Sequence, residues 1–352
     1  MKFEPELFTF KDGTPVITAA DWQKRRKELV AILAENEFGI TPPAPACVKG
    51  EVIPSKETHC CGNASCEKVN ISFETERGEF TFPINLFIPK SDKPVPVMLL
   101  INFRPDRYDK YCPTEEIIDN GFAVAQLYYN DITTDDCFDF DKLASMYDRS
   151  KSNSWGQIGI WAFAASRVID YLVTRPEIDK ENIAVVGHSR LGKTALWCGA
   201  QDERVKYTCS NDSGCAGAAY ERIKHGESET LKAITDRFPF WFCENYAKYA
   251  DKVNEMPFDQ HFLIAACAPR YVCVNSASLD AWADPYSEQL SCVGASPAWT
   301  LCGKTGFAGD TTPVAVGECN ADGDIAYHLR PGKHFLSRYD WNCYMKFIKS
   351  KM

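Results

Sequence analysis

Four short, almost purely apolar segments, separated by longer helical stretches, restrict the fold of this chain more than any other feature. They occupy residues 96–103, 122–129, 182–187 and 270–277. Strands that are buried on both faces have this composition, whereas strands with one solvated face alternate apolar and polar residues. The pattern therefore predicts a parallel β-sheet that is covered by helices.

Three further segments complete the predicted order of elements. Residues 69–89 alternate apolar and polar side chains around Arg77-Gly78, which is typical of an antiparallel hairpin. Residues 156–178 and 14–36 place apolar side chains at helical spacing. A hairpin followed by alternating parallel strands and helices is the order of the α/β-hydrolase fold. We therefore expect a three-layer sandwich with a mostly parallel central sheet and an N-terminal antiparallel hairpin.

Length and composition bound the domain organisation and the partners. A chain of 352 residues with 45% hydrophobic and 25% charged residues is typical of a soluble globular protein. We expect one α/β-hydrolase domain over 1–352, in which 1–68 form an N-terminal extension packed on a catalytic core at 69–352. The net charge of −9 argues against a nucleic-acid partner. No segment approaches the roughly 18 apolar residues that a membrane span requires.

The N-terminal residues and the cysteines bear on the cellular location. The opening segment, MKFEPELFTFKDG, lacks the apolar centre of a secretory signal. The location is secreted or periplasmic if a signal was removed, and cytoplasmic otherwise. Of the 16 cysteines, those inside apolar runs are predicted to be buried: Cys198, Cys209, Cys267 and Cys273. Those in a loop-like stretch are candidates for disulfides or metal binding: Cys60, Cys61 and Cys66.

The segment 181–200, ENIAVVGHSRLGKTALWCGA, contains the candidate nucleophile. A buried strand ends at Gly187, and a helix begins just after Ser189. A serine on a sharp turn between a strand and a helix is the arrangement of a nucleophile elbow. The G-x-S-x-G pattern is not strictly met, because Leu191 stands in place of the second glycine. Serine is also a favoured helix N-cap, so both readings of Ser189 stay open at this point.

The order of the histidines indicates the general base. In the α/β-hydrolase fold the acid and then the histidine follow the nucleophile along the chain. Only His328 and His334 follow the last parallel-strand segment. His334 lies in a Pro-Gly-Lys loop before the final amphipathic helix, where a catalytic histidine is expected. His328 lies in alternating residues typical of a strand, so we predict that His334 is the base.

The string GHSRLGK resembles the nucleophile signature of glucuronoyl esterases, carbohydrate esterase family 15. Further stretches are similar to the bacterial branch of that family: WGQIGIWAF, NDSGCAGAA, FPFWFCENYAKY, MPFDQHFLIAACAPR, LDAWADP and YHLRPGKHFLSRYDW. Together they extend from about residue 96 to the C-terminus. The resemblance implies a serine esterase that hydrolyses the ester of (4-O-methyl-)glucuronic acid side chains of xylan with lignin-type alcohols, through a glucuronoyl-enzyme intermediate.

The same resemblance implies roles for four more residues. It places the Arg190 guanidinium at the oxyanion, where the alternative is an ordinary surface ion pair. It assigns Lys193 to a hydroxyl of the glucuronate ring, where the alternative is a solvated helix lysine. Trp282 matches a tryptophan that contacts the sugar. Glu227 is a weaker candidate for substrate binding, because its segment varies within the family.

Two aspartates remain candidates for the triad acid. Asp280 follows the strand at 270–277 by a short loop, which is the usual position of the acid in this fold. Asp212 follows the segment VKYTCSN and aligns with a glutamate that some family members use. Since aspartate is one methylene shorter than glutamate, we expect Asp212 to reach His334 less easily, and we predict that Asp280 is the acid.

The predicted mechanism needs no metal and no organic cofactor, and the chain has no D-x-D-x-D or H-E-x-x-H motif. Two alternatives to the glucuronoyl esterase remain. One is an acetyl or feruloyl xylan esterase with the same Ser189 and His334, and the other is a non-catalytic carbohydrate-binding relative. The sequence leaves the oligomeric state and the disulfide pattern open.

Overall fold

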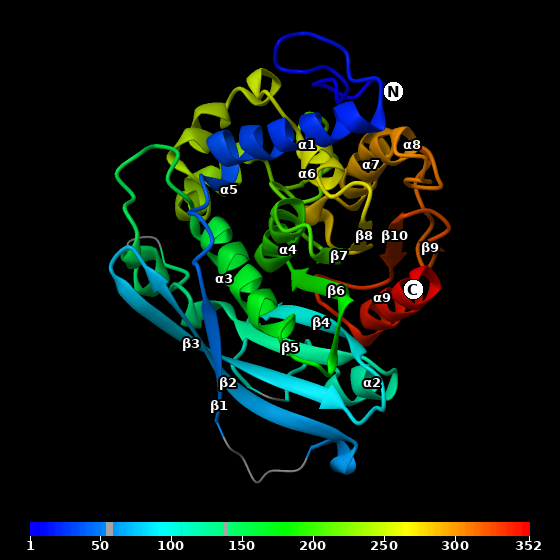
Figure 1. The fold of residues 1–352 in the computed structure, drawn as a ribbon. Coiled ribbons are helices and arrows are strands. Elements are labelled where there is room, and N and C mark those ends of the chain that lie inside the picture. The colour runs from blue at the N-terminus through cyan, green and yellow to red at the C-terminus, as the bar shows by residue number, and fades with distance from the viewer. Residues whose placement is uncertain (54–58, 107, 137–139) are drawn as a thin grey trace.

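A computed structural model describes residues 1–53, 59–106, 108–136 and 140–352, and in this part of the chain ten strands form one sheet (Figure 1). Their order across the sheet is β1-β2-β3-β5-β4-β6-β7-β8-β10-β9. The bounds are β1 Val48–Ile53, β2 Ala64–Thr75, β3 Gly78–Pro89, β4 Val95–Asn102, β5 Ala123–Tyr128, β6 Ile178–His188, β7 Val205–Asn211, β8 Tyr271–Ala277, β9 Cys319–Asn320 and β10 Ile325–Arg330.

The central strands are parallel, and the strands at both ends of the sheet are antiparallel. β5, β4, β6, β7, β8 and β10 pair in parallel. β1, β2 and β3 pair antiparallel, β3 joins β5 antiparallel, and β9 pairs antiparallel with β10. The predicted hairpin is confirmed, with Thr75 opposite Gly78 next to the turn. The four predicted apolar strands correspond to β4, β5, β6 and β8.

Helices cover both faces of the sheet (Figure 1). Side chains alternate along β4, so that Val97, Leu99 and Ile101 join one apolar core and Met98 and Leu100 join the other. The first core also contains residues of the helices α1 Ala19–Leu33, α3 Gln157–Leu172, α4 Arg190–Gln201, α5 Leu231–Arg237, α6 Gln260–Ala265, α7 Pro285–Ala295 and α8 Pro297–Leu301. The second contains residues of α2 Thr114–Asp119 and α9 Arg338–Lys351. This is the predicted three-layer α/β-hydrolase architecture.

The predicted N-terminal helix is α1, which is shorter than 14–36 and continues as one π-helical turn, Ala34–Phe38. Thr18 caps its first turn by accepting a hydrogen bond from the backbone N–H of Asp21. Arg26 on α1 donates to the backbone carbonyls of Ala266 and Ala200, and Trp22 is fully buried. The helix is thus attached to the core by both apolar and polar contacts.

The predicted burial of four cysteines is also confirmed, since Cys198, Cys209, Cys267 and Cys273 are buried. In the described parts of the chain, the helices are all too short or too polar to span a membrane.

Candidate active site

Ser189 lies on the sharp turn between β6 and α4. Its backbone has φ 58° and ψ −129°, and residues other than glycine seldom adopt such a positive φ. The Ser189 N–H donates to the carbonyl of Asn211 on β7, and its own carbonyl accepts from the N–H of Gly192. The Ser189 side chain makes no N-capping hydrogen bond to α4. The turn therefore does not serve the capping interaction that was the alternative reading of this serine.

The turn can form only because position 187 is a glycine. A Cβ at Gly187 would lie 1.9 Å from the carbonyl oxygen of Leu191, closer than any two such atoms can approach. Leu191 stands where the motif has its second glycine. The core accommodates its side chain, which is fully buried. Gly192 instead lies against β7, where its closest neighbours include the Asn211 carbonyl.

The carboxyl ends of β6, β7 and β8 bring three predicted site residues to one edge of the sheet. These strands are neighbours and parallel, so the residues that follow them lie side by side. Ser189 follows β6, Asp212 follows β7, and Asp280 follows β8. His334 comes from the loop between β10 and α9. One carboxylate oxygen of each aspartate and one ring nitrogen of His334 lie within 4.8 Å of one another.

His334 is hydrogen-bonded to Asp280. The distance between His334 Nδ1 and Asp280 Oδ2 is 2.5 Å, which leaves Nε2 as the ring nitrogen that can exchange a proton with another group. The imidazole is partly exposed, whereas the Asp280 carboxylate is nearly buried. The ring of His188, next to Ser189 in sequence, packs against that of His334 with 4.4 Å between centroids. Burial, followed by the nearby His334, lowers the pKa of His188 to about 3, so His188 is neutral.

Asp212 is also close to His334, but it bonds to the backbone of the His334 loop. Its Oδ2 accepts from the Phe335 N–H at 3.3 Å and from Arg330 Nη2 at 3.2 Å. Burial and the charge of Glu288 raise the pKa of Asp212 well above its usual value. These bonds attach the loop that carries His334 to the end of β7.

Arg190 lies at the start of α4 and is held by residues that sequence analysis missed. Its Nη1 donates to Asp135 Oδ2, and its guanidinium lies 4.7 Å from the ring centroid of Trp241. Trp241 Nε1 donates to the other Asp135 oxygen at 2.7 Å. The guanidinium is thereby fixed from two sides. Its Nε is buried and has no hydrogen-bond partner among the described residues.

Lys193 is buried rather than solvated. It is 4% exposed, and its Nζ donates to the backbone carbonyl of Ser213. Its charge lies among buried carboxyls: burial raises the pKa of Glu229 and of Glu37, and in each case Lys193 opposes the rise. The reading of Lys193 as an ordinary surface lysine is therefore wrong.

Glu229 is a further buried carboxyl near Lys193, and sequence analysis did not single it out. The Glu229 N–H donates to the Trp282 carbonyl at 2.9 Å. Trp282 itself is 50% exposed, as a residue that contacts a sugar must be. Glu227 is exposed on the same segment, and its role stays a prediction. Only the burial of Glu229 beside a lysine distinguishes it, and burial is not visible in the local sequence.

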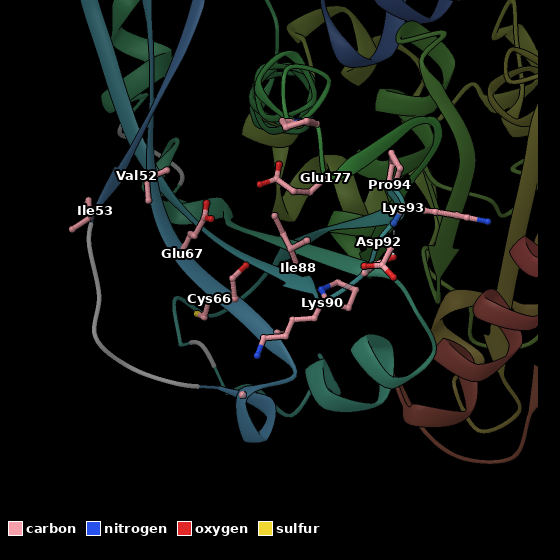
Figure 2. Close-up of a pocket in the computed structure, with 16 residues that line it drawn as sticks. Val52, Ile53, Cys66, Glu67, Ile88, Lys90, Asp92, Lys93, Pro94 and Glu177 are labelled. Carbon is pink, nitrogen blue, oxygen red and sulfur yellow. Dashed lines mark hydrogen bonds between the residues drawn. The ribbon is translucent and has the colours of Figure 1, made fainter.

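A separate hollow of about 760 Å³ lies at the hairpin side of the sheet (Figure 2). Its lining includes Val52 on β1, Glu67 on β2, Ile88 on β3 and the following loop with Lys90 and Asp92. These residues belong to the first three strands and the loop after β3, whereas Ser189 and its neighbours follow β6, β7 and β8. The hollow is therefore not part of the group around Ser189.

Comparison with known proteins identifies the family. A family model described as fungal glucuronyl esterase matches residues 69–303. A carbohydrate esterase from an unidentified prokaryote, MZ0003, is 35% identical over 99% of this chain and 89% of its own length. The chain belongs to the glucuronoyl esterase family. The predicted membership of carbohydrate esterase family 15 is thus confirmed.

Solved structures of family members have the same fold. The glucuronoyl esterase from Solibacter usitatus superposes with a TM-score of 0.90 at 33% identity, over 100% of this chain and 98% of the other. A promiscuous esterase of carbohydrate esterase family 15 from a marine bacterial metagenome gives 0.88 at 33% identity, with the same coverage. A 4-O-methyl-glucuronoyl methylesterase from Schizophyllum commune is 29% identical over 76% of this glucuronoyl esterase and 65% of its own length.

Proposed function

We propose that this glucuronoyl esterase hydrolyses the ester at C6 of glucuronic or 4-O-methylglucuronic acid side chains of xylan, including esters with lignin-type alcohols. Family membership makes the chain a carboxylic ester hydrolase. Relatives from Schizophyllum commune and Podospora anserina are named 4-O-methyl-glucuronoyl methylesterases, which supports a glucuronate ester as substrate. The observation that supports the proposal most is a buried lysine one helical turn after the elbow serine, whose charge lies close to the buried carboxyl of Glu229.

The proposed reaction is a two-step acyl transfer. His334 Nε2 removes the proton of Ser189 Oγ as that oxygen attacks the ester carbonyl, and then returns it to the departing alcohol. The glucuronoyl group is left as an ester of Ser189. Water, deprotonated by the same nitrogen, hydrolyses this ester and restores the serine. Asp280 holds Nδ1–H, which fixes the tautomer and stabilises the imidazolium that forms in each step.

Negative charge on the carbonyl oxygen is stabilised by Arg190 in this proposal. The backbone N–H of Arg190 follows the nucleophile directly, as in other nucleophile elbows. Its guanidinium supplies a second, charged donor, which is oriented by Asp135 and Trp241 before substrate arrives. A donor fixed in advance contributes on the order of 3 kcal/mol to the transition state.

The sugar ring is recognised by Lys193, Glu229 and Trp282 in this proposal. Lys193 offers N–H donors to a ring hydroxyl, and Glu229 offers a carboxylate that can accept a hydrogen bond from another. The exposed indole of Trp282 packs against the sugar. A simple acetate ester has none of these hydroxyls, so it gains nothing from this part of the site.

Turnover of benzyl glucuronate and of p-nitrophenyl acetate, measured side by side, tests the proposal. We expect a much higher kcat/KM for the glucuronate ester, whereas an acetyl esterase would prefer the acetate. Ser189→Ala should abolish hydrolysis of both esters with an unchanged circular dichroism spectrum, because it removes only one oxygen. Residual activity within tenfold of the wild type would refute the role of Ser189.

A further inference from the structure

Two cysteines and one histidine lie together where β9 and β10 meet α9, away from the residues assigned to ester hydrolysis. Cys319 on β9 is the direct cross-strand partner of His328 on β10, so their side chains are on the same face of the sheet. Cys343 comes from α9, the helix that covers this face (Figure 1). One ligand atom from each of the three residues lies within 4.8 Å of the other two.

The histidine of this group is oriented by a buried carboxylate. His328 Nε2 is 2.9 Å from Asp340 Oδ1, and both side chains are at most 3% exposed. Asp340 precedes Cys343 by three residues on α9, so the two side chains are on one face of the helix. With Nε2 bound to Asp340, Nδ1 is the ring nitrogen left for a ligand. A carboxylate on the second nitrogen of a histidine is the usual partner of a metal-binding imidazole.

The dimensions and the donor types fit one class of metal ion. Tetrahedral zinc, with bonds of about 2.3 Å to sulfur and 2.0 Å to nitrogen, places its ligand atoms roughly 3.5 to 3.8 Å apart. Since no pair of the observed ligand atoms is more than 4.8 Å apart, each pair needs to approach by at most about 1.0 to 1.3 Å. Two sulfurs and one imidazole favour a soft or borderline ion over Mg²⁺ or Ca²⁺. Cys319 is exposed, so water can occupy the fourth position from its side.

We propose that Cys319, His328 and Cys343 form a binding site for Zn²⁺ or a similar thiolate-preferring divalent cation, with Asp340 orienting the imidazole. Binding displaces the thiol protons of Cys319 and Cys343, as is usual for thiolate sites.

The bound ion would fasten α9 to the edge of the sheet. Asp340 also accepts hydrogen bonds from Arg330, and Arg330 donates to the carbonyls of Lys333 and Phe335, on either side of His334. The metal site is therefore connected by two hydrogen-bonding residues to the loop that presents the proposed general base. The site is structural in this proposal, since its residues do not contact Ser189 or the sugar-binding group in the described contacts.

Titration of the reduced protein with Co²⁺ under argon tests the site directly. Cobalt bound by thiolates in tetrahedral geometry gives a sulfur-to-metal charge-transfer absorption and intense visible bands. We expect both to saturate at one equivalent in the wild type and in Cys302→Ser, a control cysteine on the opposite face of the sheet. In Cys319→Ser and Cys343→Ser the charge-transfer absorption should be lost, or the affinity for Zn²⁺, measured by displacement of bound Co²⁺, should fall roughly a hundredfold. The reason is that zinc seldom accepts a serine ligand.

Thermal unfolding provides the second measurement. Zn²⁺ should raise the Tm of the wild type and of Cys302→Ser, since an ion that binds only the folded chain stabilises it, and should leave that of Cys319→Ser unchanged. Cys319 is exposed, so its replacement does not disturb the core. The proposal is overturned if the wild type shows no thiolate-cobalt absorption, or if all four proteins bind Co²⁺ alike. It is equally overturned if Cys319 and Cys343 resist reduction because they form a disulfide.

Discussion

Asp280 and Asp212 carry the same carboxylate at the ends of neighbouring strands, yet their partners differ. Asp280 binds the ring of His334, and Asp212 binds a backbone N–H and the Arg330 guanidinium. An acid that fixes the imidazole tautomer must contact the ring itself. We therefore propose that Asp280 is the triad acid and that Asp212 positions the His334 loop.

Exchange of each aspartate for asparagine separates these roles. Asp280→Asn should lower kcat more than about a hundredfold, because the amide no longer stabilises the imidazolium. Asp212→Asn should cost much less, since an amide oxygen can still accept the hydrogen bonds from Phe335 and Arg330. Steady-state kinetics on benzyl glucuronate measure both. A crippled Asp212→Asn enzyme beside a nearly normal Asp280→Asn enzyme would reverse the assignment.

Lys193 permits a test of substrate recognition at a single residue. Lys193→Met keeps most of the buried stem and removes the charge and its donors. We expect kcat/KM for benzyl glucuronate to fall about tenfold to a hundredfold, the effect of losing one charged hydrogen bond, while hydrolysis of p-nitrophenyl acetate changes little. Equal losses on the two esters would indicate a structural role for the lysine instead.

At the level of elements, the sequence predicts what depends on local pattern. The buried strands, the hairpin and the elbow each have a periodicity or a turn residue that identifies them, and His328 indeed lies in a strand. The side chains that surround the site, in contrast, are not predicted by any local pattern. Asp135 and Trp241 reach Arg190 from 55 and 51 positions along the chain, and only the packing of the loops brings them together. No local pattern records such a contact, and for the same reason the burial of Glu229 could not be foreseen.

The elbow is the element whose geometry depends most on one residue, Gly187. Gly187→Ala would force a Cβ into the Leu191 carbonyl at 1.9 Å, so we expect a loss of about 3 kcal/mol of unfolding free energy or more, and of esterase activity. Gly192→Ala is the matched control: its closest contact is 3.1 Å, and alanine is favoured in a helix. Thermal unfolding and kinetics of both variants make the comparison. Similar behaviour of the two would show that the turn tolerates a side chain at position 187.

At the scale of the whole molecule, the N-terminal segment and the core are joined around a buried histidine. His261 on α6 is fully buried, and its Nε2 is hydrogen-bonded to the carbonyl of Pro5. Phe3 packs against both His261 and Tyr220, and the Tyr220 hydroxyl donates to the Glu4 carbonyl. Protonation of His261 would therefore place an unpaired charge where the first residues of the chain meet the core.

This arrangement predicts a specific loss of stability in acid. Burial lowers the pKa of His261 to about 3, against about 6.5 in an unfolded chain. Between these values only the unfolded state binds the proton, so the His261 contribution to stability is complete above pH 6.5 and is lost as the pH falls toward 3. Buried carboxyls such as Glu288, whose pKa burial raises to about 7, act in the opposite direction. The total change with pH therefore does not isolate the histidine, whereas a variant does.

His261→Gln removes the titrating group and leaves the carboxyls unchanged. Urea denaturation at pH 7 and pH 5 gives the free energy of unfolding of both proteins at both values. The variant is expected to be less stable at pH 7, because it repacks a filled site. Between pH 7 and pH 5, however, the wild type should lose about 2 kcal/mol more than the variant, since 1.5 pH units below 6.5 correspond to that energy. Parallel changes in the two proteins would mean that His261 takes up its proton in the folded state, and that the junction between the N-terminal segment and the core admits water.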